Sequence, residues 1–441
     1  MSERWARTIL STYRWAGAAA YPLIGGYVAW RASKGKEDRS RRGERYGKAK
    51  IERPAGPLIW THAASVGETT AVMPLLERIA GYGINVVLTT GTVTSAQIVK
   101  ERLKDRVIHQ YVPLDLKPAV SHFLNHWDPD LAIMAESEIW PMTILELGAR
   151  RVPQVLVNGR LSDRSFAQWS KRAYLAEALF ENLAHVVAQS DVDGERFSAL
   201  GARPVTVSGN LKVDTVPPPV DDAKLETIRR QIFPRKTWAA ISTHDGEEMI
   251  AAEVHKVLKP RHPGLLTIIV PRHPDRADAL MKDFTAAGLK VARRSKGEVI
   301  EPGTDILLGD TIGEMGLYLR LTEVAFVGRS LTAQGGQNPL EPAMLETAVL
   351  AGQNVQNFRV AYDRLIDAGG AKLVKDRGML AGAVNYLLNN EMARRGMIKA
   401  GASAVEDMRG ALDRTLKALD PFLQPLMVKS RLRDGNGNGR Y

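Results

Sequence analysis

The chain has 441 residues, of which 44% are hydrophobic, so it is long enough for two or three globular domains with sizeable cores. Its 60 basic and 49 acidic residues give a formal charge of +11, which predicts an anionic partner such as a nucleic acid, a membrane surface or a phosphorylated substrate. The sequence has no cysteine, which excludes disulfides, thiolate catalysis and thiolate zinc sites and fits the cytoplasmic side of a membrane.

The N-terminal segment from Trp15 to Trp30 carries no charge, has aromatic residues at both ends and is flanked by basic residues. It is slightly shorter than the roughly 20 apolar residues of a full membrane span and contains Pro22. No clear small-residue cleavage site follows, which argues against a secretory signal peptide. We expect residues 1–35 to form a membrane anchor or an interfacial helix, and a buried first helix is the alternative.

Short apolar runs alternate with helical patterns in the first half of the chain, and each run has the length of a buried strand. We expect strands at residues 58–64, 84–90, 131–136, 154–159, 185–190 and 205–210. A proline-rich stretch at 214–222 follows and is typical of a stiff linker. The second half repeats the scheme, with strands expected at residues 237–243, 265–271, 291–295, 305–310, 323–328 and 348–352.

Continuous apolar strands separated by helices predict parallel sheets that are covered on both faces. We therefore predict an α/β fold with two Rossmann-like, doubly wound domains that face a cleft, at residues 36–213 and 223–433, followed by a disordered tail at 434–441. Ligands of such sheets bind beyond the carboxyl ends of the strands, so the residues after each strand are the candidates for function.

Polar and glycine residues gather after the predicted strands in both halves, in the segments SVGE (65–68), ESE (136–138), GNLK (209–212), PRHP (271–274), DTIGEM (310–315) and GGQNPLEP (335–342). A purely structural reading exists for each of them. Glu68 suits the first turn of a helix, where the dipole favours negative charge. Glu138 is a possible ion-pair partner of Arg160, and Arg272 of Asp275. Lys212 also reads as a solvated loop lysine.

The stretch FVGRSLTAQGGQNPLEPAML has the pattern of a strand that ends near Leu331 and is followed by a loop and a helix. Gly335-Gly336 permits backbone angles that other residues avoid. Asn338 suits a helix N-cap and Pro339 the first helical turn. We expect open backbone N–H groups here to hold a phosphate and Glu341 to accept sugar hydroxyls. A well-made strand-to-helix turn is the alternative.

No metal or nucleotide motif of the common kinds is present. Asp191 and Asp193 mimic the metal-binding acid pair of many sugar transferases, but they start a helix, so a helix cap explains them better. His62, His244 and His273 lie beside strand ends without a metal-binding spacing such as H-E-x-x-H. The absence of G-x-G-x-x-G after the first strand and of G-x-x-x-x-G-K-[ST] disfavours a nicotinamide enzyme and a phosphate-loop NTPase.

Eight motifs occur in order along the chain: HAASVGE, AESEIWP, NGRLSDRS, GNLKVD, STHDGEE, PRHPDR, DTIGEM and GGQNPLEP. Together they resemble the motifs of the 3-deoxy-D-manno-octulosonic acid (Kdo) transferases of Gram-negative bacteria. That family has the glycosyltransferase B-type fold and an N-terminal membrane anchor. The resemblance implies inverting, metal-independent transfer of Kdo from CMP-Kdo to a phosphorylated lipid A precursor. It also implies no cofactor, no nucleic acid, and a place on the anionic cytoplasmic face of the bacterial inner membrane.

Carried over residue by residue, the resemblance assigns Glu68 as the general base and Glu138 and Lys212 as stabilisers of the transition state. It assigns CMP binding to Pro271, Arg272, Gly313, Glu314, Met315, Asn338, Pro339, Leu340 and Glu341. Arg160 and Arg164 are candidates for binding the carboxylate of Kdo. The family usually has Gly where Arg329 stands and His where Gln337 stands, and both departures flank the expected donor loop.

Two alternatives stay open. One is a transferase of the same fold that acts on another envelope sugar with a UDP donor, and inhibition by CMP but not by UDP would exclude it. The other is a non-catalytic protein of the membrane surface that binds anionic lipid or nucleic acid. In that case the polar motifs after the strands would have no task.

Overall fold

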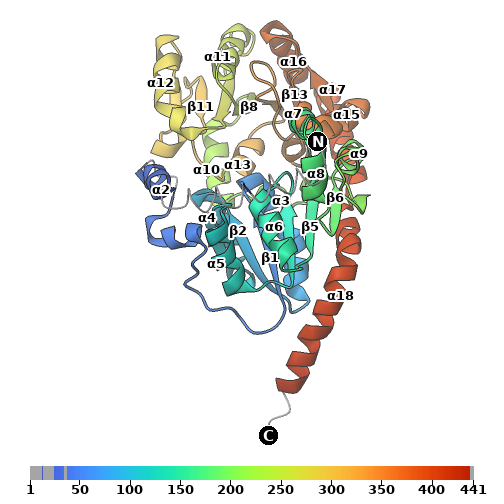
Figure 1. Ribbon diagram of the computed structural model, residues 1–441. Helices are drawn as coiled ribbons and strands as arrows, with labels where there is room; N and C mark the ends of the chain where they lie inside the picture. The colour runs from blue at the N-terminus through green and yellow to red at the C-terminus, as the bar shows by residue number, and fades with distance from the viewer. Residues whose placement is uncertain (1–11, 13–23, 34–36, 438–441) are drawn as a thin grey trace. The chain divides into compact units, whose positions relative to one another are not determined.

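The computed structural model describes residues 12, 24–33 and 37–437, and the chain forms two compact units. Unit 1 comprises Met1–Thr215 and Arg409–Tyr441, and unit 2 comprises Val216–Met408. Each unit contains a parallel β-sheet with helices packed against it (Figure 1). The fold class predicted from the apolar runs, two parallel-sheet α/β domains, is confirmed.

The sheet of unit 1 has seven parallel strands in the described part of the chain, in the order β3-β2-β1-β4-β5-β6-β7. The strands are β1 (Leu58–Ala63), β2 (Asn85–Thr90), β3 (Ile108–Tyr111), β4 (Leu131–Ala135), β5 (Gln154–Gly159), β6 (His185–Ala188) and β7 (Val205–Val207). The helices are α2 (Ile24–Ser33), α3 (Val66–Gly81), α4 (Val93–Arg102), α5 (Lys117–Trp127), α6 (Pro141–Ala149), α7 (Asp163–Ser170), α8 (Ala173–Phe180), α9 (Asp191–Ala199) and α18 (Ala411–Gly437), with 3-10 turns η2 (Arg39–Tyr46), η3 (Lys104–Arg106) and η4 (Leu211–Val213).

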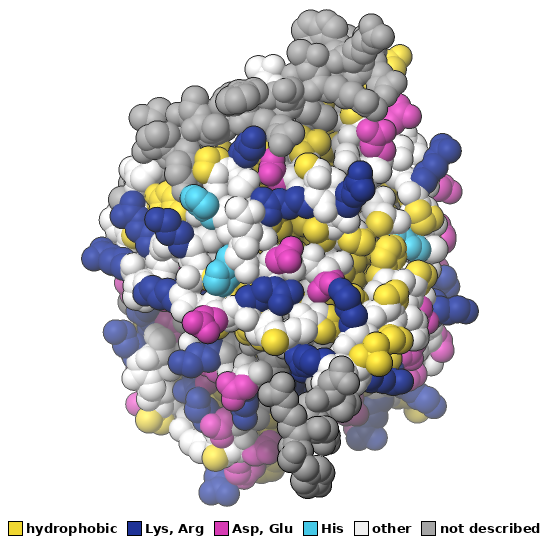
Figure 2. All heavy atoms as spheres, turned by 60° about the horizontal axis from the view of Figure 1, so that its bottom comes forward, with side chains coloured by type: hydrophobic (Ala, Val, Ile, Leu, Met, Phe, Trp, Pro, Cys, Tyr) yellow, Lys and Arg dark blue, Asp and Glu magenta, His cyan; other side chains and the backbone are white. Residues whose placement is uncertain are grey.

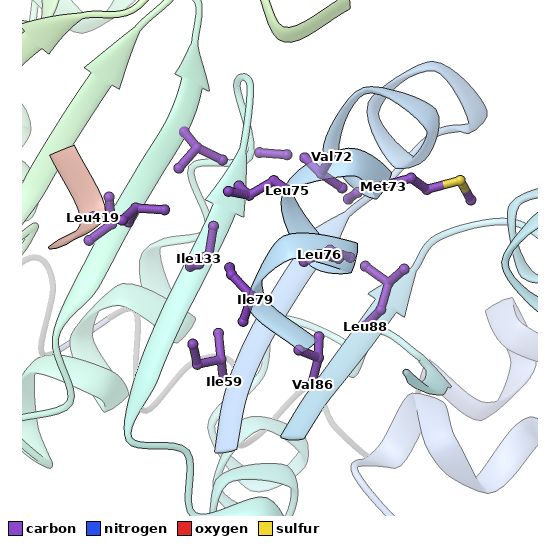
Figure 3. Packing of buried hydrophobic residues seen from close by; sticks show 14 of the residues in the cluster. Ile59, Val72, Met73, Leu75, Leu76, Ile79, Val86, Leu88, Ile133 and Leu419 are labelled. Carbon is purple, nitrogen blue, oxygen red and sulfur yellow. The ribbon is translucent and has the colours of Figure 1, made fainter. Parts of the chain in front are cut away.

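Alternate residues of these strands belong to two separate cores, because successive side chains of a strand point to opposite faces. Ile59 and Ile133 pack with α3, α4 and α18, where Leu419 enters the same cluster (Figure 3). Trp60 and Met134 pack instead with α5, α6, α8 and α9. Since both faces are buried, the strands read as continuous apolar runs in the sequence.

The sheet of unit 2 also has seven parallel strands among the described residues, in the order β10-β11-β9-β8-β12-β13-β14. They are β8 (Thr237–Thr243), β9 (Leu266–Pro271), β10 (Val291–Arg293), β11 (Ile306–Leu308), β12 (Val324–Val327), β13 (Ala348–Ala351) and β14 (Ala371–Leu373). The helices are α10 (Asp222–Ile232), α11 (Glu247–Leu258), α12 (Ala277–Ala286), α13 (Met315–Leu319), α14 (Leu340–Met344), α15 (Arg359–Asp367), α16 (Arg377–Asn389) and α17 (Glu391–Asp407), with 3-10 turns η5 (Pro274–Arg276), η6 (Arg294–Lys296) and η7 (Gln356–Phe358).

Two strands and one strand end differ from the prediction. β3 and β14 were not expected, because each has only three or four residues and carries polar side chains such as Gln110 and Lys372. The strand end expected near Leu331 lies at Val327, because the following residues turn away to meet a buried carboxylate described below. The remaining predicted strands are present within a few residues.

The C-terminal segment corrects the predicted domain limits. Residues 409–433 were expected in the second domain, but α18 belongs to unit 1 and its Leu419 and Leu423 lie in the unit 1 core. Residues 434–437, expected in a disordered tail, are the last residues of α18. The proline-rich stretch 214–222 begins at the limit of unit 1 and continues into unit 2, where Arg320 donates to the carbonyl of Pro218 at 2.8 Å.

The expected N-terminal membrane segment lies partly outside the described residues. Its described part contributes to α2, where the carbonyl of Gly25 accepts a 2.7 Å hydrogen bond from Arg42 Nη2 on η2. Among residues 12, 24–33 and 37–437, no helix combines the length and the apolar character that crossing a bilayer requires.

Asp214 fixes the start of α18 to the end of the first part of unit 1. Its carboxylate accepts from Gly410 N at 2.9 Å and from Leu412 N at 2.5 Å, so a residue distant in sequence acts as the helix cap. This carboxylate joins the last helix of the chain to residues that precede unit 2.

We predict that Asp214→Ala weakens the first turn of α18 by about 1–2 kcal/mol, the cost of a lost helix cap. Amide hydrogen exchange over α18, followed by mass spectrometry, should accelerate about 5- to 30-fold. Asp413→Ala is the control, because Asp413 is in the same turn and its side chain is 78% exposed. Equal exchange in the two variants would contradict the capping role.

Candidate active site

In each unit the candidate residues follow the strands at which the strand order reverses. In unit 1 the reversal lies between β1 and β4, and Glu68 and Glu138 follow these two strands. In unit 2 it lies between β8 and β12, and His244 and the loop that starts at Gly328 follow these. Doubly wound sheets bind ligands at this position, so each unit has a candidate ligand-binding position of its own.

Glu68 begins α3 as part of a capping box. Ser65 is the N-cap: its Oγ accepts from Glu68 N and donates to Glu68 Oε1 at 2.7 Å, while Ala64 N donates to Oε2 at 2.8 Å. The side chain is half-buried. Burial and then the nearby carboxylates of Glu138 and Glu136 raise the pKa of Glu68 despite these hydrogen bonds. The structural reading of Glu68, a carboxylate in the first turn of a helix, is therefore confirmed, and its catalytic role stays a prediction.

Glu136 is a buried acid near Glu68 at the switch point of unit 1. Its backbone has a φ of 55°, and its carboxylate pairs with Lys212 Nζ from η4 and accepts from Asn158 Nδ2 at 3.4 Å. Asn158 Oδ1 in turn accepts from Leu211 N at 3.0 Å, so the loop that carries Lys212 is attached to β5. Lys212 is therefore not a free loop lysine but the cation that balances Glu136.

Glu138 lies in the same loop after β4 and has different partners. Its Oε2 accepts from Trp140 Nε1 at 2.5 Å and lies 3.4 Å from His62 Nε2 of β1. The ionisable side chain that approaches Glu138 is thus His62, whereas the structural alternative named Arg160. The two carboxylates near Glu68 both follow β4, and their partners come from β1, β5, η4 and Trp140 of the same loop.

The acid pair after β6 belongs to the start of a helix, as expected, although the N-cap residue is Ser190 and the two acids lie in the first turn. Ser190 is the N-cap of α9, its Oγ donates to Asp193 Oδ2 at 2.5 Å, and Asp193 Oδ1 accepts from Leu161 N at 2.8 Å. Within the described ranges, no group of three or more His, Asp or Glu side chains is arranged to hold a metal ion.

In unit 2 the loops after β8, β9 and β12 meet at His244. Its ring contacts that of His273 at 5.5 Å, and its Nε2 lies 3.1 Å from Gln337 Nε2. Burial and the positive charges of Arg329, His273 and Arg272 lower the pKa of His244 despite Glu247. Positive charge therefore accumulates at the switch point of unit 2, whereas negative charge accumulates at that of unit 1.

Glu247, the first residue of α11, holds the loop after β12. Its fully buried carboxylate accepts from His244 N at 2.9 Å and from Arg329 N, Ser330 N and Leu331 N at 2.6, 2.8 and 3.0 Å. A Cβ on Gly328 would stand 2.7 Å from its Oε2, so only glycine fits there. Sequence reasoning missed Glu247, because adjacent Glu247 and Glu248 do not reveal which one faces the loop.

Gly335 and Gly336 lie farther along this loop and adopt the expected backbone angles, but they do not offer the open N–H groups that were expected. Gly335 and Gly336 have φ values of 123° and 73°. Their N–H groups are not open, since Gly335 N donates to Gln356 Oε1 at 3.1 Å and Gly336 N donates to Arg329 O at 2.8 Å. The prediction that these two N–H groups hold a phosphate is therefore wrong in this structure.

Helix α14 starts one residue later than predicted, at Leu340, with Pro339 as its cap residue. Asn338 still contributes a cap-like hydrogen bond, because its Oδ1 accepts from Leu340 N at 3.1 Å. Its Nδ2 donates to Glu341 Oε1 at 3.3 Å, which places the Glu341 carboxylate beside the loop.

The other candidate donor residues follow the neighbouring strands β9 and β11. Pro271 ends β9, and Arg272 is exposed and makes no ion pair with a described residue, so the pairing with Asp275 that the structural alternative supposed is absent. Gly313 has a φ of 83°, and Met315 begins α13. Burial opposes ionisation of Glu314, yet hydrogen bonding from Thr311 and the charge of Arg294 hold its pKa below the usual value.

The chain is similar in sequence to known proteins. Residues 40–215 match the family model described as 3-Deoxy-D-manno-octulosonic-acid transferase (kdotransferase). The 3-deoxy-D-manno-octulosonic acid transferase of Haemophilus influenzae is 34% identical over 412 residues, 91% of this chain and 96% of that protein. The enzyme of the same name from Bordetella pertussis is 35% identical over 401 residues, 86% of this chain and 91% of that protein.

The fold also has relatives among solved structures. A glycosyltransferase from Rickettsia africae superposes with a TM-score of 0.58 at 13% identity, over 84% of this chain and 99% of that chain. Fold and sequence relatives together define an enzyme of the glycosyltransferase class. The chain belongs to the 3-deoxy-D-manno-octulosonic acid transferase family.

We predict that Glu247→Gln destabilises unit 2 by about 2–3 kcal/mol, because an amide nitrogen would face backbone N–H groups that now donate to a carboxylate. Glu253→Gln is the control: Glu253 lies on the same helix, is half-exposed and pairs only at the surface with Arg377. Thermal unfolding would check both variants. Equal melting temperatures for the two variants would contradict the anchoring role of Glu247.

The Gly-to-Arg departure at position 329 has a backbone consequence. Arg329 has a φ of 55°, a left-handed conformation that glycine adopts freely. We predict that Arg329→Gly is more stable than Arg329→Ala by about 1 kcal/mol, because alanine keeps the strain and both variants lack the guanidinium. Chemical denaturation of the two variants measures the difference, and an equal or higher stability of the alanine variant would contradict it.

Proposed function

We propose that this enzyme transfers Kdo from CMP-Kdo to a hydroxyl of a phosphorylated lipid A precursor, with inversion at the anomeric carbon and without a metal ion. Family membership supports the transferred sugar. The single observation that supports the mechanism is Glu68: a carboxylate of raised pKa that follows β1 at the switch point of its sheet.

In the proposed step the acceptor hydroxyl gives its proton to Glu68 while its oxygen attacks C2 of Kdo. The bond between C2 and the phosphate oxygen breaks, and CMP leaves with the electron pair of that bond. Glu68 suits this task because its pKa is raised above that of an ordinary glutamate. The acceptor hydroxyl has to give up its proton only as its oxygen attacks C2, so a carboxylate can serve as the base. Glu138 and Lys212 remain proposed stabilisers of the transition state, and Lys212 acts from its pairing with Glu136.

The proposed donor groups on unit 2 are Pro271, Arg272, Gly313–Met315 and Asn338–Glu341. Arg272 is exposed and can approach the phosphate of CMP, and the cations around His244 add to the positive potential there. Because the N–H groups of Gly335 and Gly336 are engaged, the proposal assigns phosphate binding mainly to these side chains. Glu341 is the proposed acceptor of ribose hydroxyls.

We further propose that the enzyme acts on the cytoplasmic face of the bacterial inner membrane. The surplus of basic residues and the uncharged segment between Trp15 and Trp30 support this location. On the face shown in Figure 2, Lys and Arg side chains are dispersed among Asp and Glu side chains. Incubation with CMP-Kdo and a lipid A precursor, followed by mass spectrometry, tests donor, acceptor and product together. A second experiment adds CMP to the same reaction as an inhibitor, and failure of CMP to inhibit would favour another donor.

We predict that Glu68→Gln lowers kcat by about 10² to 10⁴, the usual contribution of a general base, while CMP affinity stays nearly unchanged. Glutamine still completes a capping box with Ser65, so α3 should remain folded. Glu77→Gln on the same helix is the control, since its carboxylate only pairs with Arg106. Steady-state kinetics and CMP titration check this, and an unchanged kcat would remove Glu68 from the mechanism.

A further inference from the structure

His62 lies next to Glu138, which is one of the two carboxylates near the proposed base, but it is too deeply buried to touch a substrate. It belongs to β1, six residues before Glu68, and only 1% of its surface is exposed. Its Nδ1 lies 3.0 Å from the carbonyl oxygen of Thr89 and 3.0 Å from Thr89 Oγ1 on β2. Any function of His62 must therefore act through a neighbouring side chain.

The hydrogen bonds around Thr89 decide which nitrogen of His62 carries a proton. Thr89 Oγ1 donates its hydrogen to Thr61 O at 3.3 Å and accepts from Trp60 Nε1 at 2.9 Å. The carbonyl of Thr89 can only accept. Both neighbours of His62 Nδ1 are thus acceptors toward it, so Nδ1 bears a hydrogen.

The other nitrogen faces Glu138. His62 Nε2 lies 3.4 Å from Glu138 Oε2 and makes no hydrogen bond to a described residue. In a neutral ring with its hydrogen on Nδ1, Nε2 would present a lone pair to a carboxylate oxygen, and a buried acceptor without a donor costs free energy. A proton on Nε2 turns the same contact into a charge-assisted one.

We propose that His62 is a positioning residue of the transfer site: as an imidazolium it pairs with Glu138 through Nε2 and holds that carboxylate, with its charge balanced, beside Glu68. The inference rests on the proposed function, because it assigns the pair to the site of Glu68.

The consequence concerns the charge that Glu68 experiences. The ionisable groups at this position of unit 1 are Glu68 on α3, Glu136 and Glu138 after β4, Lys212 on η4 and His62 on β1. Lys212 balances Glu136 and the imidazolium balances Glu138. Glu68 is then the carboxylate without a cationic partner among the described residues, which is the property a proton acceptor needs.

Nitrogen-15 NMR of the full chain with labelled histidine tests the protonation state directly. We expect His62, assigned among the nine histidines by its loss in His62→Gln, to show both ring nitrogens protonated at pH 7. Glu138→Gln should convert it to a neutral ring, because the balancing carboxylate is gone. A neutral ring with a bare Nε2 in the unaltered protein would overturn the proposal. This result does not depend on turnover, so it separates this inference from the proposed function.

The kinetic test uses two replacements of the ring. The amide of asparagine lies near the place of Nδ1, so His62→Asn keeps the donor to Thr89, whereas His62→Gln keeps a donor toward Glu138. Both remove the positive charge, so we expect the acidic limb of kcat/KM to move to higher pH by about one unit in both, since an unbalanced Glu138 disfavours ionised Glu68. Only His62→Asn should lower the plateau kcat, by about tenfold. If His62 had only a structural role, both variants would lower the melting temperature, and the acidic limb of kcat/KM would stay at the same pH.

Discussion

Carboxylates that accept backbone N–H groups hold the loops after the central strands of both units. In unit 2, Glu247 gathers the backbone of Arg329, Ser330 and Leu331 onto the start of α11. In unit 1, Glu68 closes the turn between β1 and α3 through Ala64. Open loops at the carboxyl ends of parallel strands have many unpaired N–H groups, and a buried acid satisfies several of them at once. The geometry of the candidate position in each unit depends on this arrangement.

The same feature, a carboxylate that anchors a loop, lies in opposite electrostatic environments in the two units. In unit 1 the anchoring acid stands among other acids, so Glu68 holds a proton more readily than an ordinary glutamate does. In unit 2 the anchoring acid is enclosed, and the groups around it that reach outward are cations such as Arg272 and Arg329. Under the proposed function, the first environment suits removal of a proton from the acceptor, and the second suits departure of a nucleotide with its phosphate.

The sequence predicted the sheets well because their strands are buried on both faces and leave long apolar runs. It failed for β3 and β14, since three or four residues with polar side chains leave no such run. It located Glu68 and Glu138 by their position after strands, but the partners of each side chain depend on contacts between distant segments. His62 illustrates this: a lone histidine before S-V-G-E has no pattern that indicates Glu138 as its neighbour. The assignment of α18 was likewise beyond local reasoning, because an amphipathic helix does not specify which core it covers.

The path of the chain through its two units affects how the protein can be made. Unit 2 is continuous from Val216 to Met408, whereas unit 1 is interrupted and takes Leu416, Leu419, Leu423 and Leu426 of α18 into its core. On a ribosome, unit 2 can complete its core as soon as it emerges, although it is encoded later. Unit 1 must wait with one face of its sheet incompletely covered until the last helix is synthesised. The part of the chain that is translated first is therefore the part that finishes folding last.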